Sequence, residues 1–274
     1  MPVGPAAGGS RSGEPAGGRE PAVGVVLDLT DRVRCLWTDA SHGDLGFAAA
    51  ADATASGSGV GSGVGSGVAG TEARPGVAGV APSQVGGANL TWLRQVHGAT
   101  VVRVGTGLSG GLGEGDALVA PPASVGDQAP GLCILTADCA SIALAGDDGS
   151  YAAVHAGWRG LIAGVVDGAA RALRSGGASR IVGVVGPCIH AECYEFSPRD
   201  LDVLTARFGD TVRGRTASGR PALDLPSAVA IALADADIEQ HRGLDACTSC
   251  HGGFFSHRAR GDIGRQALVV WGVP

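Results

Sequence analysis

The sequence contains no lysine, so all 20 basic residues are arginine, and the formal net charge is −6. The arginines form no cluster that resembles a nucleic-acid-binding patch, so we expect no nucleic-acid partner. No apolar run approaches the roughly 20 residues that span a membrane. The N-terminus lacks the basic start and the continuous apolar segment of a signal peptide. We therefore expect a cytoplasmic, monomeric protein without a membrane partner.

Cysteine occurs in an odd number, seven, and without an export signal. This usage favours reduced thiols that bind metal or do chemistry over a disulfide framework. Apolar residues make up 45% of the chain, which is enough for a substantial core. We therefore expect a globular protein with reactive or metal-binding thiols rather than a disulfide-stabilised one.

Two stretches in the first third of the chain are strongly biased in composition. Residues 1–21 are rich in Gly, Pro, Ala, Ser and Arg, which predicts a disordered tail. Residues from about 50 to 87 are dominated by Ala, Gly, Ser and Val, and their centre repeats the unit Gly-Ser-Gly-Val. Because such a repeat has little to pack, we interpret it as a mobile insertion. We expect one catalytic domain over residues 22–274, interrupted by this insertion.

The rest of the chain alternates apolar strand-like runs with amphipathic segments. Helices are predicted after Gly157 up to a stop at Gly176-Gly177, from Pro198 to Phe208 and from Pro226 to Ala236. Strands are predicted at 23–29, 33–37, 91–97, 100–104, 131–139, 151–155, 180–185 and 266–271. This mixture, with one clear βαβ-like step, predicts an α/β or α+β core.

Three metal-binding residue types stand at or just past the ends of predicted strands: His97, Cys139 and His155. Imidazole and thiolate are good zinc ligands, and three protein ligands leave a fourth position open for water or substrate. Zinc can lower the pKa of such a water to about 7. Their spacing matches no compact metal motif, so the spacing alone does not place them together.

The short sequence motifs around these residues are more specific than their spacing. The chain contains, in order, Gln95-Val-His-Gly, Ala137-Asp-Cys, His155-Ala-Gly-Trp-Arg-Gly, Gly186-Pro-Cys-Ile, Cys193-Tyr-Glu, Cys247-Thr, Phe255-Ser-His-Arg and Gly264-Arg-Gln. From about Thr91 to Val273 the chain therefore resembles the multicopper polyphenol oxidase (laccase-domain) family, now usually described as purine nucleoside phosphorylases and including the peptidoglycan editing factors.

The resemblance implies a fold and a metal site. The expected fold is α+β: an α/β sandwich with mixed β-sheets, layered α/β/β/α and related to toxin-type cysteine hydrolases. The resemblance also implies that His97, Cys139 and His155 bind one zinc ion. The implied activities are phosphorolysis of adenosine, inosine and methylthioadenosine, and deamination of adenosine. The segment Thr38 to Gly46 departs from the family pattern. If these residues help to hold substrate, the family's substrate specificity and turnover do not carry over to this chain.

Six further residues are candidates for chemistry. Asp138, Arg159 and Cys188 are candidate catalytic residues, and Gln95, Arg258 and Arg265 are candidate substrate-binding residues. Asp138 is a proton acceptor or simply caps the turn after its strand. Arg159 binds an anion or forms an ion pair with Asp167 or Glu195. Cys188 would need a thiolate beside a histidine to act as a nucleophile.

Two other cofactors are disfavoured. Cys247-Thr-Ser-Cys250-His251 matches the haem-attachment pattern, but no export signal is seen and the only methionine is Met1. A structural zinc that also uses His257 is conceivable, but we interpret this motif as a coincidence. Copper is disfavoured because seven histidines without an H-x-H pair cannot supply a multicopper oxidase. We expect one zinc ion, no haem and no copper.

Three functional hypotheses follow. The first is a zinc-dependent enzyme that acts on purine nucleosides. The second is an amidase that uses the same site to remove a wrong amino acid from a cell-wall precursor. The third is a regulatory protein with a relict zinc site. The first two imply a small-molecule substrate.

Overall fold

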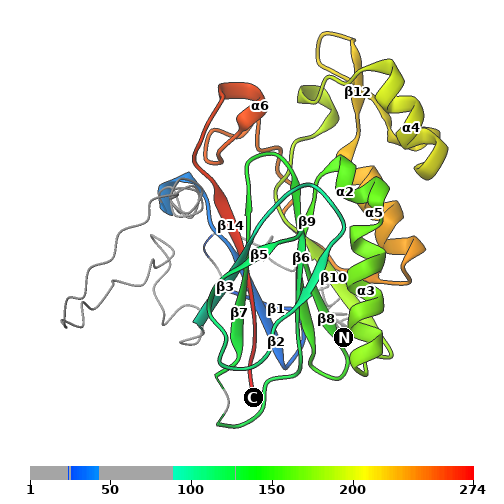
Figure 1. The fold of residues 1–274 in the computed structure, drawn as a ribbon. Helices are drawn as coiled ribbons and strands as arrows, with labels where there is room; N and C mark the ends of the chain where they lie inside the picture. Colours follow the sequence, from blue (N-terminus) through cyan, green and yellow to red (C-terminus); the bar gives the residue numbers. More distant parts are fainter. Residues whose placement is uncertain (1–23, 25, 43–88, 127) are drawn as a thin grey trace, which may run out of the picture.

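The computed structural model describes residues 24, 26–42, 89–126 and 128–274, and these residues build two large mixed sheets with helices to one side (Figure 1). The predicted tail at 1–21 and the predicted insertion at 50–87 lie outside the described residues, as do residues 23 and 25 of the strand predicted at 23–29. The domain boundaries therefore stay predictions.

The first sheet has six strands in the order β1-β2-β14-β7-β3-β5. Its strands are β1 (Leu27–Asp28), β2 (Val33–Trp37), β3 (Asn89–Arg94), β5 (Gly110–Glu114), β7 (Pro130–Thr136) and β14 (Gln266–Gly272). β14 pairs antiparallel with β2 and β7, whereas β3 pairs parallel with β5 and β7. The sheet is therefore mixed.

The second sheet also has six strands, in the order β13-β10-β8-β9-β6-β4. Its strands are β4 (Val101–Arg103), β6 (Ala117–Ala120), β8 (Ala140–Gly146), β9 (Tyr151–Ala156), β10 (Ile181–Val185) and β13 (Glu239–Gln240). β8 lies antiparallel between β9 and β10, so the helical crossover from β9 to β10 passes over β8. A separate hairpin is formed by β11 (Arg213–Arg215) and β12 (Pro221–Leu223).

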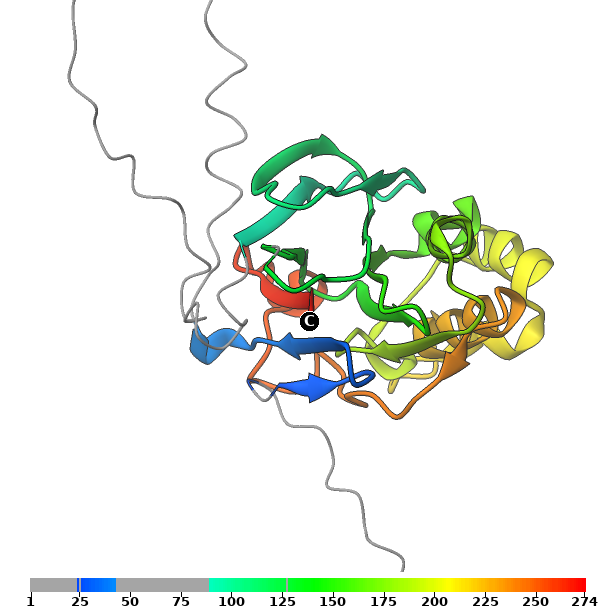
Figure 2. The ribbon, with the colours of Figure 1, turned by 90° about the horizontal axis from the view of Figure 1, so that it is seen from below.

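The two sheets pack face to face, as the view along the strands in Figure 2 shows. Side chains of β7 alternate, since Leu132 and Ile134 join the core between the sheets while Cys133 faces the other way. β8 instead is buried on both faces: Ala143 lies between the sheets and Ile142 under the helices. A strand covered on both sides carries a continuous apolar run, and β8 is the longest of the strands that the sequence did not predict; the others are β5, β6, β11, β12 and β13.

The helices of more than one turn gather on the outer side of the second sheet, three of them against the sheet itself and one beyond its end (Figure 1). They are α2 (Trp158–Ala163), α3 (Val165–Gly176), α4 (Pro198–Phe208) and α5 (Leu225–Asp235). Single turns are formed by η1 (Ala40–His42), η4 (Ala191–Cys193), η5 (Asp210–Val212) and α6 (His257–Arg260). α4 starts at the predicted residue and α5 starts one residue earlier than predicted; the side chains of Ser197 and Asp224 cap the two helices ahead of a proline in the first turn.

The α+β class with two mixed sheets is confirmed, and one detail of the helices needs correction. The single helix predicted after Gly157 is two helices, α2 and α3, separated by Gly164 in the left-handed region at φ 84°. The apolar spacing runs through the break without interruption, so the pattern hides it. The predicted stop is correct, because α3 ends at Gly176 and Gly177 caps it at φ 132°.

Candidate metal centre

His97, Cys139 and His155 meet at one end of the sandwich, where two connections cross from the first sheet to the second. His97 lies between β3 and β4, and Cys139 lies between β7 and β8. His155 is on β9, where it pairs with Ser141, two residues after Cys139. The sheet register therefore brings His155 beside Cys139, and the crossover after β3 delivers His97 to the same point.

The three side chains converge with their donor atoms within 4.8 Å of one another. The Cys139 Sγ lies 3.7 Å from His97 Nε2, and the two imidazole rings meet edge to face with centroids 4.8 Å apart. His155 is buried and His97 is exposed. These three residues could hold a metal ion that is reached from the His97 side.

Asp116, just before β6, organises this trio and was not found in the sequence analysis. Its side chain is fully buried, and its Oδ1 lies 2.8 Å from His155 Nδ1. The same carboxylate accepts the backbone N–H groups of His97 (2.9 Å) and Gly98 (2.7 Å). Asp116 therefore fixes the His155 ring with Nε2 free for a metal and also fixes the turn that carries His97.

We expect Asp116→Asn to weaken zinc binding by about 10- to 100-fold, because outer partners of metal-bound histidines typically have effects of that size. An amide can still accept one N–H bond but no longer stabilises the His155 tautomer as a carboxylate does. Zinc affinity measured by competition with a chelator checks this. Asp28→Asn, which alters an exposed ion pair with Arg34, is the matched control and should leave affinity unchanged. Equal affinities for all three proteins would contradict the orienting role.

The electrostatics of the trio favour the metal-binding form of the thiol. Burial opposes ionisation of Cys139, but hydrogen bonds and charge from His155 and His97 outweigh it and lower the pKa to about 6. Burial likewise opposes protonation of His155, yet the contacts with Asp116 and Cys139 raise its pKa to about 9. In the metal-free protein the pair is therefore a thiolate beside an imidazolium, and a cation that binds there displaces the proton.

The backbone around the trio is unusual. Three described residues other than glycine have positive φ, and two of them are His97 (φ 60°) and Asp138 (φ 99°). Such conformations are costly and tend to concentrate where function requires them. Gly157 approaches the trio closely: a Cβ at this position would lie 2.8 Å from His97 Cδ2 and 3.1 Å from Cys139 Sγ. The glycine after His155-Ala156 is therefore needed by the site.

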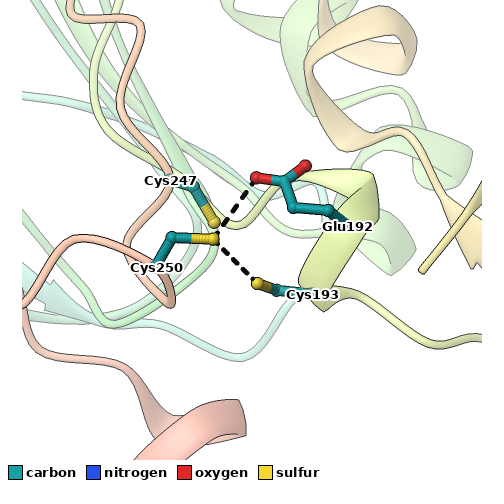
Figure 3. Close-up of side chains that lie close together, drawn as sticks. All are labelled: Glu192, Cys193, Cys247 and Cys250. Carbon is teal, nitrogen blue, oxygen red and sulfur yellow. Dashed lines mark hydrogen bonds between the residues drawn. The ribbon is translucent and has the colours of Figure 1, made fainter. Parts of the chain in front are cut away.

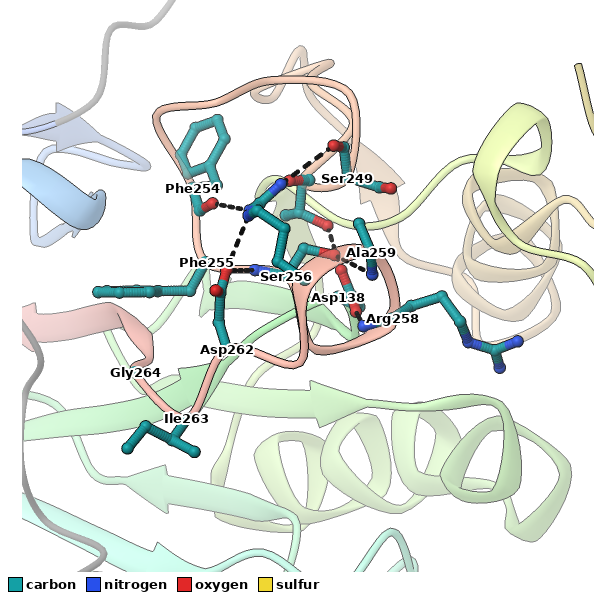
Figure 4. A network of polar contacts seen from close by, with 12 residues as sticks. Asp138, Ser249, Phe254, Phe255, Ser256, Arg258, Ala259, Asp262, Ile263 and Gly264 are labelled. Atoms are coloured by element: carbon teal, nitrogen blue, oxygen red, sulfur yellow. Dashed lines mark hydrogen bonds and ion pairs between the residues drawn. The ribbon is translucent and has the colours of Figure 1, made fainter.

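Asp138, the residue before Cys139, contacts the C-terminal segment that carries Arg258 (Figure 4). Its Oδ1 accepts the hydroxyl of Thr248 at 2.8 Å, and its Oδ2 accepts the backbone N–H of Arg258 at 2.6 Å. The carboxylate is buried. Both oxygens already accept hydrogen bonds, which supports the structural alternative that the sequence left open; the role of Asp138 as a proton acceptor stays a prediction.

Two predicted arginines lie near the trio, each over an aromatic ring. The Arg159 guanidinium lies 4.3 Å from the ring centroid of Trp158, and that of Arg258 lies 5.0 Å from Tyr194. Phe196 joins the two rings, with centroids 5.4 Å from Trp158 and 5.1 Å from Tyr194. Both arginine side chains are exposed.

Ion pairing does not account for Arg159. The two acidic residues considered as its partners, Asp167 and Glu195, pair instead with Arg171 and Arg220. Within the described part of the chain, Arg159 is therefore available to an anion. Arg258 in turn donates one hydrogen bond to the Glu195 carbonyl at 3.0 Å, which leaves its other N–H groups for a ligand.

The other predicted site residues make structural contacts. The Gln95 amide pairs with the backbone of Leu135, donating to its carbonyl at 2.7 Å and accepting its N–H at 2.9 Å. Arg265 donates to the carbonyls of Asp262, Ile263 and Gly264. Cys188 is buried, and burial raises the pKa of its thiol. These contacts disfavour a thiolate nucleophile at Cys188 and a direct substrate contact by Gln95.

Two histidines and one cysteine thus form a group that could hold a metal ion, at one end of two packed mixed sheets. The chain belongs to the family described as multi-copper polyphenol oxidoreductase laccase, which it matches over residues 78–272. It is 35% identical over 189 residues to a purine nucleoside phosphorylase of Streptomyces coelicolor, covering 67% of this chain and 75% of the relative. It is 30% identical over 184 residues to a purine nucleoside phosphorylase of Escherichia coli, covering 66% and 72%.

A solved structure from Neisseria meningitidis shares the fold, with a TM-score of 0.63 at 22% identity, covering 91% of this chain and 99% of that one. None of the helices in the described residues has both the length and the apolar character needed to cross a membrane.

Proposed function

We propose that this chain is a zinc-dependent enzyme that cleaves purine nucleosides with phosphate. Adenosine, inosine and methylthioadenosine are the proposed substrates, and deamination of adenosine is a proposed second activity. The observation that carries the proposal is the convergence of His97, Cys139 and His155 on one point, with Asp116 orienting His155. The names of the Streptomyces and Escherichia relatives support the choice of substrate.

The donor set fits zinc. Two imidazoles and one thiolate make a catalytic type of zinc site with one position open. The same donors form blue-copper sites when a weak axial ligand, usually methionine, is added, but the only methionine of this chain is Met1. When bound, zinc would act as a Lewis acid toward an oxygen of the substrate or of water.

The surrounding side chains can bind the other reactant. Phosphate carries one or two negative charges near neutral pH, and a planar guanidinium binds it with paired hydrogen bonds. Arg159 and Arg258 are exposed at two ends of an aromatic group formed by Trp158, Phe196 and Tyr194. We assign phosphate binding to these two arginines, and apolar contact with the nucleoside to the partly exposed ring of Trp158. Arg265 stays a predicted substrate contact of lesser weight.

We expect Arg159→Ala and Arg258→Ala each to raise the KM for phosphate about tenfold or more, because a hydrogen bond to a charged group is worth about 1.5–3 kcal/mol. Initial rates at varied phosphate and fixed adenosine measure this. Arg171→Ala on α3 removes an exposed ion pair with Asp167 and serves as the matched control. An unchanged KM for phosphate in both site variants would remove these arginines from the proposed anion site.

The proposal is tested with purified protein by supplying adenosine with phosphate, and separately a muramyl amino-acid amide. Phosphate-dependent release of adenine with ribose 1-phosphate is the expected result. Release of the amino acid with no turnover of nucleoside would favour the amidase alternative. If zinc-loaded protein forms neither product, only the regulatory alternative is left.

A further inference from the structure

A second group of metal-binding side chains lies apart from the trio, formed by Glu192 and Cys193 on η4 and by Cys247 and Cys250 on the turn after β13 (Figure 3). The four donor atoms lie within 4.8 Å of one another. Cys193 Sγ is 3.0 Å from Cys250 Sγ, which in turn is 3.4 Å from Glu192 Oε1. Residues 57 positions apart in the chain are thus brought to one point.

We propose that Glu192, Cys193, Cys247 and Cys250 form a second metal site, which holds one thiophilic divalent cation such as Zn²⁺ and joins η4 to the 247–250 turn. Four protein donors close the coordination shell, which is typical of a structural site. Two ligands come from each of two short segments, and Cys247 and Cys250 have the C-x-x-C spacing common in such sites.

The surroundings of Cys247 suit a metal-bound thiolate. Its sulfur accepts the backbone N–H of His190 at 3.4 Å. The four donor atoms lie within 4.8 Å of one another and three of them are sulfur, so the group suits a cation that prefers thiolate ligands.

This arrangement changes the interpretation of the Cys247-Thr-Ser-Cys250-His251 motif. From the sequence, His257 was the conceivable additional zinc ligand, and the motif was interpreted as a coincidence. In the structure the partners of the two cysteines are Cys193 and Glu192 instead. Two residues so far away in the chain could not be paired with the motif from spacing alone.

The second site is coupled to the first through the chain. Cys247 forms a β-bridge with Cys188, and Thr248, the next residue, donates to Asp138 beside Cys139. A cation between η4 and the 247–250 turn would therefore fix the segment that carries Thr248. The second site has a structural role, and its existence does not depend on the proposed nucleoside chemistry.

A disulfide between Cys193 and Cys250 is the main competing arrangement, because their sulfur atoms are already close. It would need an oxidant and would use only two of the four donors. The structure has both cysteines as free thiols. The presence of Cys247 and Glu192 at the same point favours the metal.

The test measures metal and thiols in full-length protein purified with a reductant and then freed of loose metal. We expect about two zinc ions per chain, one for each group of ligands. Cys193→Ser with Cys250→Ser should retain about one, and Ser249→Ala, inside the same turn, should retain both. Glu192→Gln, at an exposed position, gives a milder variant that should weaken the second ion without unfolding the chain.

A Cys139→Ala background separates this proposal from the proposed function. Its first centre lacks the only thiol, so thiolate-to-cobalt charge-transfer absorption after loading with Co²⁺ must come from the second group. We expect that absorption to persist in Cys139→Ala and to disappear when Cys193→Ser and Cys250→Ser are added. No such absorption in Cys139→Ala, or a Cys193–Cys250 disulfide in protein that binds only one zinc ion, would overturn the proposal, whatever the enzymatic assays show.

Discussion

Cys139→Ala protein is expected to bind about one zinc ion fewer than the wild type and to lose more than about 100-fold of its phosphate-dependent turnover of adenosine. Even the loss of an outer partner typically costs 10- to 100-fold, and Cys139 is the only thiol of the trio. Removing its thiolate also leaves the His155 imidazolium without one of its two partners. Zinc content measured by mass spectrometry, together with initial rates, checks both effects.

The matched control for this variant is Cys133→Ala, six residues earlier on β7. Cys133 is fully buried among apolar side chains on the face of the first sheet that points away from the second sheet. Its loss should reduce stability slightly and leave zinc and turnover unchanged. If Cys139→Ala retains the zinc content and rate of the control, Cys139 is not a ligand and the centre is misassigned.

Gly157→Ala is expected to lower zinc affinity by about 10- to 100-fold while the fold is retained. The added methyl group would lie 2.8 Å from His97 Cδ2 and 3.1 Å from Cys139 Sγ, so one of these two side chains must move. Overpacking of this kind typically costs about 1–3 kcal/mol, and each 1.4 kcal/mol corresponds to about tenfold in affinity. Chelator competition measures the affinity, and circular dichroism with thermal unfolding monitors the fold.

Gly176→Ala provides the control for backbone effects at glycine. A Cβ at Gly176 would meet only the Arg103 side chain, at 3.9 Å, and the position is the last residue of α3. This variant should bind zinc as the wild type does and unfold at a similar temperature. Unaltered zinc affinity in Gly157→Ala would show that His97 and Cys139 are less closely packed against residue 157 than in the structure.

The three candidate metal ligands could be predicted because specific local motifs mark them. His97, Cys139 and His155 each lie in a short, specific sequence motif, and each motif lies at or just after the end of a strand. Their convergence depends on two crossovers between sheets, which no spacing reveals. The resemblance to a known family, rather than the spacing, therefore placed the three residues together.

Asp116 shows what the sequence hides. It stands in an unremarkable Gly-Asp-Ala step before β6, and its importance comes from contacts with His97, Gly98 and His155, which are 18 to 39 positions away. A buried carboxylate of this kind is recognised only once the turns around it are in place. The signal that was present is an acidic residue directly ahead of a fully apolar strand.

The misjudged elements have a common cause. Gly164 interrupts a helix whose apolar spacing is continuous, and β8 is buried on both faces, so neither produces a periodic signal of its own. Spacing along the chain likewise does not connect Cys247 and Cys250 with Glu192 and Cys193, which lie on a distant turn. Patterns along the chain detect local periodicity, whereas these features are set by long-range packing.

The most direct test of the central claim is removal and restoration of the metal in the wild-type chain. Protein treated with a chelator should lose phosphate-dependent cleavage of adenosine, and added Zn²⁺ should restore it in a colourless protein. Added Zn²⁺ should not restore this activity in Cys139→Ala. Turnover that persists after metal removal, or a blue protein whose activity returns only with copper, would contradict the account.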